Sequence, residues 1–392
     1  MNRERLLINW VYYHAIGHTI EALRYAHNWR TANPHLEIAI ALNARAGVEL
    51  AQCVPGVDCV YPVEVGEFET PNGQGKPLEQ IPGEWDYYVV DPRHKHPMGW
   101  DALDHCEQAM RAHIQAGFVA DDWDSWSRLP LHGVAVPLAF CLPLAARKFA
   151  KDFLATPHKT RITLLFGSGA EPSRTPALNF WRRLIGELIE AFGDVEIILL
   201  GASKAGQSIT QGITAADVDG LLKEFPQARN GFDLGLLNQL ALAECCQLHI
   251  SPHTGMSFAI QCVGVPWLVI SGGDVAENVV NGVPFASIYP DCAFYPCGPW
   301  FAPQKNPMLP ECVARREKGE AFLCLSESAL EPKFPQIHAA ARALVNEAWP
   351  YFDCVQHHYR AMLPRLGKQD GEAFLDGWPS VLSQTFVFPG KK

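Results

Sequence analysis

The chain has 392 residues, of which 48% are hydrophobic and 19% charged, so it can bury large cores and is not a disordered protein. Lys plus Arg number 32 against 42 for Asp plus Glu, and the formal net charge of −10 argues against nucleic acid as a partner. No run approaches the ~18 apolar residues of a membrane span, and the first residues lack a signal-peptide pattern, so we expect a cytoplasmic protein.

The first part of the chain has the pattern strand, glycine turn, helix, strand. In order, it predicts a strand at Leu6–Val11, a turn at Gly17-His18, a helix at Thr19–Thr31, and strands at Glu37–Leu42 and Asp86–Asp91. Strands that alternate with helices are typical of a parallel sheet covered on both faces.

The second part repeats this plan. It predicts strands at Arg161–Phe166, Val195–Leu200, Leu248–Ile250 and Val265–Ile270, and helices at Ala177–Phe192, Leu236–Cys245 and Thr254–Cys262. Further helical patterns cover Gln336–Ala348 and Asp353–Leu363. We therefore expect an α/β protein with a first domain at 1–155, a second at 156–335, and a helical tail at 336–392. In such a pair of domains, ligands bind in a cleft at the carboxyl ends of the strands.

Two glycine-containing turns of the second domain are candidates for binding an anion. Gly167-Ser168-Gly169 follows a strand, and His253-Thr254-Gly255-Met256 opens a helix, where free N–H groups suit a pyrophosphate. Arg174 and Lys204 follow strand ends and would add positive charge. The alternatives are an ordinary turn and a helix cap without a ligand. Pro172 interrupts the G-x-G-x-x-G pattern, so NAD is not expected.

Two residues of the first domain are candidates for a general base. His18 follows the glycine turn and Asp91 ends a strand, so both would face the same cleft. The alternatives are a surface histidine and a turn cap. The turns that form the cleft hold no D-x-D pair, so we expect no Mg²⁺ requirement at a diphosphate.

These segments resemble a known family of enzymes. The stretches FGSGAEPSRTPALNFWRRL, IILLG and FDLGLLNQLALAECCQLHISPHTGMSFAIQCVGVPWLVISGG are similar to the second domain of the GT-B glycosyltransferases, in particular glycosyltransferase family 9, the ADP-heptose heptosyltransferases. HAIGHTIEALRYAHNWRTANPHLEIAIAL and EWDYYVVDPR are similar to the first domain, so the resemblance covers about Leu6–Gly273.

The resemblance implies two Rossmann-like domains facing a cleft and inverting transfer of a sugar, a heptose for example, from a nucleotide diphosphate sugar to an acceptor hydroxyl on a protein or glycan. The second domain would hold the donor, with Ser168, Thr254, Gly255 and Met256 at its phosphates. Arg174 stands where the family has a phosphate-binding Lys, and His18 where it has an acidic base. Two positions depart from the family pattern, because His253 replaces an Asp and Phe258 a His.

Four of the 12 cysteines lie close together in the sequence, at Cys292, Cys297, Cys312 and Cys324. Their spacing resembles the four-cysteine metal finger of the bacterial autotransporter heptosyltransferases, which implies zinc or iron held by thiolates. The alternative is four buried thiols.

Three alternatives to a transferase stay open at this point. They are a sugar-nucleotide epimerase of the same architecture, a binding protein that closes on its ligand, and a transferase-like protein without turnover. The sequence leaves the donor, the acceptor and the oligomeric state open, a homo-oligomer included.

Overall fold

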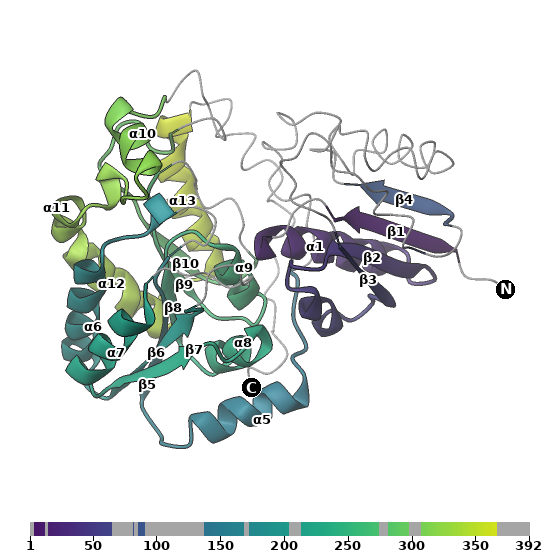
Figure 1. Ribbon diagram of the computed structural model, residues 1–392, viewed down its shortest axis with the longest axis horizontal. Coiled ribbons are helices and arrows are strands. Elements are labelled where there is room, and N and C mark those ends of the chain that lie inside the picture. Colours follow the sequence, from purple (N-terminus) through teal and green to yellow (C-terminus); the bar gives the residue numbers. More distant parts are fainter. Residues whose placement is uncertain are drawn as a thin grey trace. The chain divides into compact units, whose positions relative to one another are not determined.

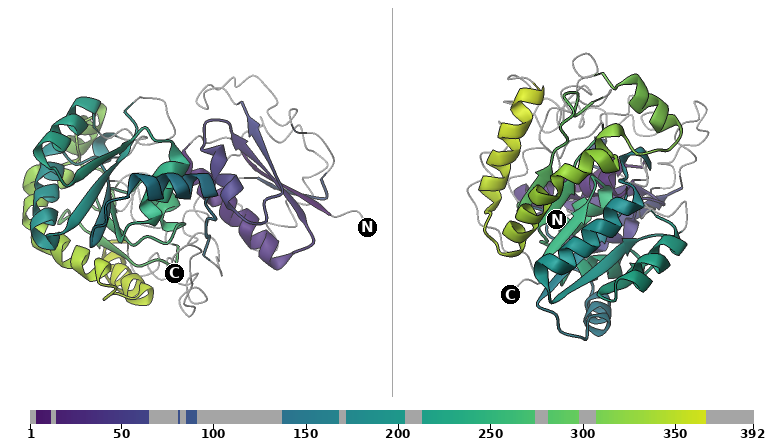
Figure 2. Two further views of the ribbon diagram at one scale, coloured as in Figure 1. Left: turned by 90° about the horizontal axis from the view of Figure 1, so that it is seen from below. Right: turned by 90° about the vertical axis from the view of Figure 1, so that its left-hand side faces the viewer.

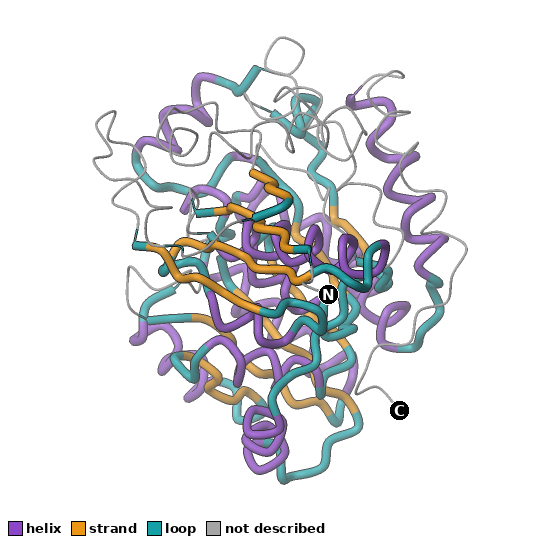
Figure 3. The backbone as a smooth tube through the Cα atoms, turned by 90° about the vertical axis from the view of Figure 1, so that its right-hand side faces the viewer, coloured by secondary structure: helices purple, strands orange, loops and turns teal. Residues whose placement is uncertain are grey.

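The computed structural model describes residues 4–11, 15–64, 81, 85–90, 137–167, 172–203, 213–273, 281–297 and 307–366. The chain divides into two compact units, Met1–Cys141 and Leu142–Lys392. Each unit is built around a parallel sheet, whose strands are drawn in orange and whose helices are drawn in purple in Figure 3.

The sheet of the first unit has the strand order β3-β2-β1-β4 (Figure 1). Its elements are β1 (Arg5–Trp10), α1 (Ile16–Ala32), β2 (Glu37–Asn43), η1 (Val48–Cys53), β3 (Cys59–Val63) and β4 (Tyr87–Val90). In β1 every residue after the first is buried, as expected of a central strand in a parallel sheet.

The sheet of the second unit has six parallel strands in the order β10-β9-β8-β5-β6-β7. The strands are β5 (Thr160–Leu165), β6 (Val195–Gly201), β7 (Ala228–Phe232), β8 (Leu248–Ser251), β9 (Trp267–Ile270) and β10 (Phe285–Ile288). The helices are α5 (Leu144–Phe153), η5 (Pro172–Arg174), α6 (Leu178–Phe192), α7 (Ala215–Glu224), α8 (Leu236–Glu244), α9 (Gly255–Gln261), α10 (Pro310–Glu317), η6 (Leu323–Leu325), α11 (Glu327–Leu330), η7 (Glu331–Lys333), α12 (Phe334–Val345) and α13 (Tyr351–Leu366).

Helices cover both faces of this six-stranded sheet, as the left panel of Figure 2 shows. Successive side chains of a strand point to opposite faces, so Ile162, Leu164 and Phe166 share one of them. These residues belong to a buried apolar cluster that includes Trp181 of α6 and Ile337 of α12. The opposite face, which α8 and α9 cover, receives the alternate residues of β5, such as Thr163.

The two sheets share one topology. Numbered from the first strand of each unit, β1 to β4 run in the order 3-2-1-4, and β5 to β10 in the order 3-2-1-4-5-6. Going across each sheet, the strand numbers first fall and then rise, and this change occurs between β1 and β4 and between β5 and β8, which are hydrogen-bonded neighbours. We call this point the strand reversal of each sheet. Ligands of such sheets bind at the carboxyl ends of the strands on either side of this reversal.

The amino ends of the strands carry matching ion pairs in the two units. Arg5 of β1 lies opposite Glu37 of β2 in the ladder, with Nε 3.3 Å from Oε1. Arg161 of β5 lies opposite Glu196 of β6 in the same way, at 2.8 Å. Glu196 is 3% exposed and also accepts from Arg229 of β7 at 3.0 Å, so its charge is paired on both sides.

The strands and helices predicted from the sequence are confirmed, with shifts of a few residues at their ends. Sequence reasoning missed β3, β7, β10, α7, α10 and α11. The helix α5, which the predicted boundary after residue 155 put in the first domain, lies in the second unit. Among the described residues, no helix is both long and apolar enough to cross a membrane.

Candidate functional site

Residues 252–256, which follow β8 and include the first two residues of α9, lie at the strand reversal of the second unit. We call this segment the capped turn. Thr254 is the N-cap of α9, and its Oγ1 accepts a hydrogen bond from the Met256 N–H at 3.1 Å. Gly255 is the first residue of the helix. Thr254 and Met256 are only 4% and 1% exposed as whole residues, so the cap is packed within the second unit.

The other predicted donor residues of the second unit are only partly described. Gly167 follows β5, whose end lies next to that of β8, so it belongs to the same strand reversal. Arg174 ends η5 and is partly exposed. Ser168, Gly169 and Lys204 lie outside the described residues.

The two departures from the family pattern pack against each other. The rings of His253 and Phe258 meet edge to face, with centroids 4.9 Å apart. Phe258 also meets Trp267 of β9 edge to face at 5.8 Å. His253 therefore belongs to an aromatic cluster at the capped turn. Its ring packs at the position where the similar family has the carboxylate of an Asp.

A chain of hydrogen bonds lies directly beneath this turn. His249 of β8 has Nδ1 3.0 Å from Thr163 Oγ1 and Nε2 3.0 Å from Ser257 Oγ. Ser257 Oγ lies 2.6 Å from Ser251 Oγ, which accepts from Trp267 Nε1 at 2.8 Å. Burial lowers the pKa of His249 to about 3, so the imidazole is neutral near pH 7.

The first unit places His18 in the first turn of α1, at its own strand reversal after β1. His18 Nδ1 lies 3.0 Å from Glu21 Oε2, one helical turn further on, and the side chains are 27% and 13% exposed. A carboxylate on Nδ1 fixes the orientation of the ring and favours the tautomer that leaves Nε2 as the proton acceptor. Asp91, the other candidate base, follows β4 but lies outside the described residues.

Buried polar side chains hold the end of β1, from which the chain leads to α1. Asn9 Oδ1 accepts from the Val11 N–H at 3.3 Å, and Asn43 Nδ2 donates to the Val11 carbonyl at 3.1 Å. Thr19 of α1 donates to the Ala46 carbonyl. These bonds fix both ends of the connection that carries His18.

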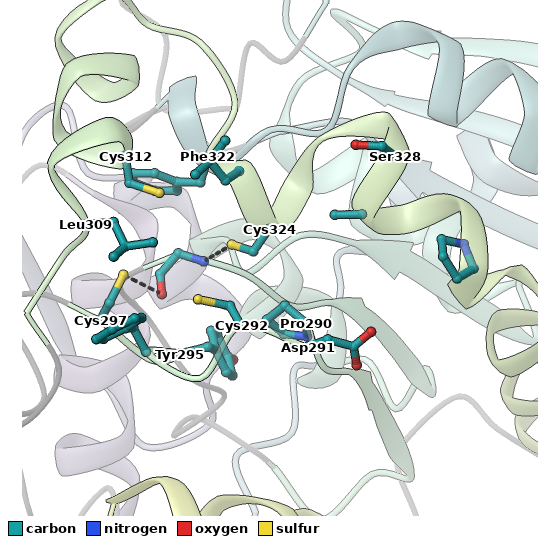
Figure 4. A pocket seen from close by; sticks show the side chains of 15 residues that line it. Pro290, Asp291, Cys292, Tyr295, Cys297, Leu309, Cys312, Phe322, Cys324 and Ser328 are labelled. Atoms are coloured by element: carbon teal, nitrogen blue, oxygen red, sulfur yellow. Dashed lines mark hydrogen bonds between the residues drawn. The ribbon is translucent and has the colours of Figure 1, made fainter.

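The four cysteines singled out in the sequence line one cavity of about 290 Å³ in the second unit. Their thiols point into this cavity from the segment after β10, from α10 and from η6 (Figure 4). Cys297 Sγ lies 3.5 Å from the Gly273 carbonyl oxygen, and Cys324 Sγ accepts from the Gly273 N–H at 3.2 Å. Gly273 has φ +79°, and a Cβ there would lie 2.6 Å from the Phe322 ring. The position between Cys297 and Cys324 therefore requires glycine.

The thiols of this cavity influence one another. Burial raises the pKa of the Cys324 thiol to about 12, and the nearby Cys292 and Cys312 raise it as well. Four thiols suit zinc or iron in kind. Within the described residues, however, no three or more His, Cys, Asp or Glu side chains are arranged to hold a metal ion. The cysteines therefore gather at one site without forming a coordination shell.

Several residues of these sites were missed by the sequence reasoning. Glu21 had a local signal, because it lies three residues after His18 on one helix face. His249, Thr163 and Ser257 had none, because they meet only when β5, β8 and α9 pack. Arg365 of α13 was missed too, although it donates to the carbonyls of Pro290, Cys292 and Tyr295 at 3.1–3.4 Å.

Comparison with known proteins identifies the fold. No family model matches the chain, and no curated protein matches it. Among solved structures, it is similar to a glycosyl transferase family 9 protein from Veillonella parvula DSM 2008, with a TM-score of 0.58 and 13% identity, covering 88% of this chain and 99% of that one. It is also similar to the E. coli ADP-heptose lps heptosyltransferase II, with a TM-score of 0.56, 13% identity and the same coverage. The predicted GT-B class, with two Rossmann-like domains, is confirmed.

Proposed function

Starting from this GT-B fold, we propose that the protein is an inverting glycosyltransferase that uses a nucleotide diphosphate sugar, a heptose donor for example. The observation that carries the proposal is the position of the candidate residues. His18 lies at the strand reversal of the first unit, and Gly167 and the capped turn at that of the second. The acceptor would be a hydroxyl of a protein or glycan.

In this proposal the second unit binds the donor diphosphate. The backbone N–H groups of Thr254 and Gly255 would bind phosphate oxygens, because the Met256 N–H already donates to Thr254 Oγ1. Arg174 would stabilise the charge that develops on the leaving diphosphate. Arginine can bind two phosphate oxygens at once, so it can replace the family's lysine. No metal at the phosphates is part of the proposal.

His18 would act as the general base. The acceptor hydroxyl must lose a proton as its oxygen attacks the anomeric carbon, and a neutral imidazole accepts a proton well near pH 7. Glu21, 3.0 Å from Nδ1, would stabilise the imidazolium that forms and leave Nε2 to take the proton. Asp91 is the alternative base.

The four-cysteine cavity would hold one zinc or iron ion through Cys292, Cys297, Cys312 and Cys324. The donor set and the shared cavity support this assignment, and the thiols would have to approach one another to coordinate. The ion would have a structural role and would fasten the segment after β10 to α10 and η6.

One observation favours a second candidate function, which is donor binding without turnover. The His253 ring packs on Phe258 where the family has a carboxylate, so an interaction with the donor sugar is changed. Donor hydrolysis or transfer by the purified protein would separate the two functions.

A thermal-shift screen of ADP-, GDP-, UDP- and dTDP-sugars tests donor binding, because a bound ligand raises the melting temperature. We expect at least one donor class to raise it, and the double variant Thr254→Ala, Arg174→Ala to abolish most of that shift. The matched control is Thr214→Ala with Arg182→Ala, since Thr214 caps α7 as Thr254 caps α9 and Arg182 is an exposed arginine of α6. Equal shifts in the two double variants would contradict the proposed site.

A further inference from the structure

The hydrogen-bond chain beneath the capped turn joins four elements of the second unit. It runs from Thr163 of β5 through His249 of β8 and Ser257 of α9 to Ser251, and it ends at Trp267 of β9. Each of these five side chains is 0% exposed. Buried polar groups are retained where their bonds specify one arrangement, and here the bonds surround a turn.

The chain closes the turn from below. Ser251 directly precedes the turn residues 252–256, and Ser257 directly follows them, so their 2.6 Å hydrogen bond joins the two ends of the segment. Ser251 Oγ also lies 2.8 Å from the Pro252 carbonyl oxygen, which belongs to the turn itself. The position of the turn therefore depends on where the Ser257 hydroxyl is held.

His249 holds that hydroxyl. A neutral imidazole has one donor and one acceptor nitrogen, so it can bond Thr163 on one side and Ser257 on the other in either tautomer. With Nε2 as the donor, the hydrogens run from His249 to Ser257, then to Ser251 and finally to the Pro252 carbonyl oxygen. A protonated ring would place donors on both sides, and burial disfavours that form.

We infer that His249 and Ser257 are positioning residues for the turn formed by residues 252–256, and hence, if the proposed function holds, for the donor diphosphate. Neither side chain is exposed, so both act through the turn and not by touching the donor. Thr163 anchors the far side of the imidazole and contributes to stability alone, because Ser257 keeps its bond to His249 when the Thr163 hydroxyl is removed.

The experiment compares two variants that each delete one hydroxyl from this chain. Ser257→Ala breaks the link to the turn, whereas Thr163→Val breaks only the anchor behind His249 and keeps the side-chain volume. The first readout is amide hydrogen exchange of Met256 and Ser257, whose N–H groups bond the Thr254 side chain and carbonyl in the free protein. The second is the Kd of ADP as a nucleoside diphosphate probe.

We expect Ser257→Ala to speed exchange of these two amides at least tenfold and to weaken ADP binding at least fivefold. Thr163→Val should leave both values within twofold of the wild type, even where its melting temperature falls. Equal effects of the two variants, or none, would overturn the inference. A wild type that binds no ADP would refute an ADP-linked donor, while the exchange comparison would still decide the role of the chain.

A second pair of variants keeps the question decidable if Ser257→Ala does not fold. In His249→Gln, the side-chain amide group lies near the position of Nε2 and can retain the hydrogen bond to Ser257. In His249→Asn, the side-chain amide group lies near the position of Nδ1 and retains the hydrogen bond to Thr163. We expect wild-type exchange at Met256 in the Gln variant and fast exchange in the Asn variant. The reverse order would show that the Ser257 link does not hold the turn.

Discussion

Three histidines at or near the two strand reversals occupy different environments. His249 is wholly buried between two hydroxyl groups, His253 packs against an aromatic ring, and His18 is partly exposed beside a carboxylate. Only the third environment suits proton transfer to a bound substrate, because its ring is accessible and a fixed carboxylate can stabilise the imidazolium.

We predict that His249 makes stability depend on pH. Its pKa is lowered to about 3 in the folded protein from 6.5 in an unfolded chain, so below pH 6.5 the unfolded state binds the extra proton. Its contribution is present above that pH and is lost as the pH falls, by about 2 kcal/mol between pH 7 and pH 5. Urea unfolding at both pH values measures the loss. Over the same pH range, the free energy of unfolding of His249→Gln should fall by about 2 kcal/mol less than that of the wild type. An equal fall in both proteins would show that His249 does not titrate this way.

The proposed base is tested by kinetics. His18→Ala should lower kcat by about 10²–10⁴-fold with donor affinity nearly unchanged, because base catalysis acts in the transition state. Glu21→Gln should lower kcat less, since it keeps a hydrogen-bond partner for the ring but removes the charge. Asp91→Asn is the comparison variant: if it loses activity while His18→Ala keeps most of it, the base is the carboxylate.

At the scale of elements, the segment from β10 to η6 is expected to depend on a metal ion. Purified protein should carry about one zinc or iron per chain, and Cys312→Ser should lose it and unfold at a lower temperature. Cys354→Ser is the matched control, because Cys354 is 4% exposed in α13 and does not line the cavity. Elemental analysis without chelator that finds no metal would leave four buried thiols as the correct interpretation.

Elements with strong local patterns were predictable, and those defined by their neighbours were not. The apolar run of β6 and the Thr254 cap of α9 could be predicted from adjacent residues alone. The strand β7, Ala228–Phe232, has a polar centre and a glycine at Gly231, whose Cβ would lie 2.8 Å from the Leu199 carbonyl oxygen. Its strand character comes from pairing with β6, which no local pattern encodes.

The candidate site divides in the same way. The location of Gly17-His18 and of His253–Met256 after the carboxyl end of a strand was predictable, because each pair of strand and helix has a strong local pattern. The predicted turn at Gly17-His18 is instead the first turn of α1, which begins at Ile16. The chain beneath the second turn was not, because its five members belong to four elements that are up to 104 positions apart in the sequence, from Thr163 to Trp267. The four cysteines were predictable as a cluster in the sequence, whereas the contacts of Cys297 and Cys324 with Gly273 required the fold.

At the scale of the whole molecule, we predict that residues 142–392 fold on their own and retain the donor-induced thermal shift. Their main buried apolar cluster is formed within Ile162–Leu344, and α5 is fastened to α8 by a two-point ion pair of Arg147 with Glu244, which is 7% exposed on its side chain. A fragment of residues 156–392 lacks α5 and leaves Glu244 unpaired. A loss of about 2 kcal/mol would lower its melting temperature by roughly 4–8 °C relative to the longer fragment. Equal melting temperatures would show that α5 does not stabilise the second unit.

The ion pairs at the amino ends of the strands separate two kinds of evolutionary change. The ion pairs Arg5–Glu37 and Arg161–Glu196 join neighbouring strands at their amino ends. The candidate ligand-binding residues follow the carboxyl ends of the strands, one strand length away. Substitutions after the carboxyl ends of the strands can therefore alter which molecule is recognised without weakening these ion pairs. A lineage could replace an acidic residue by histidine at position 18 or 253 and keep a folded chain at every intermediate step. Such an arrangement favours divergence in specificity over loss of the fold.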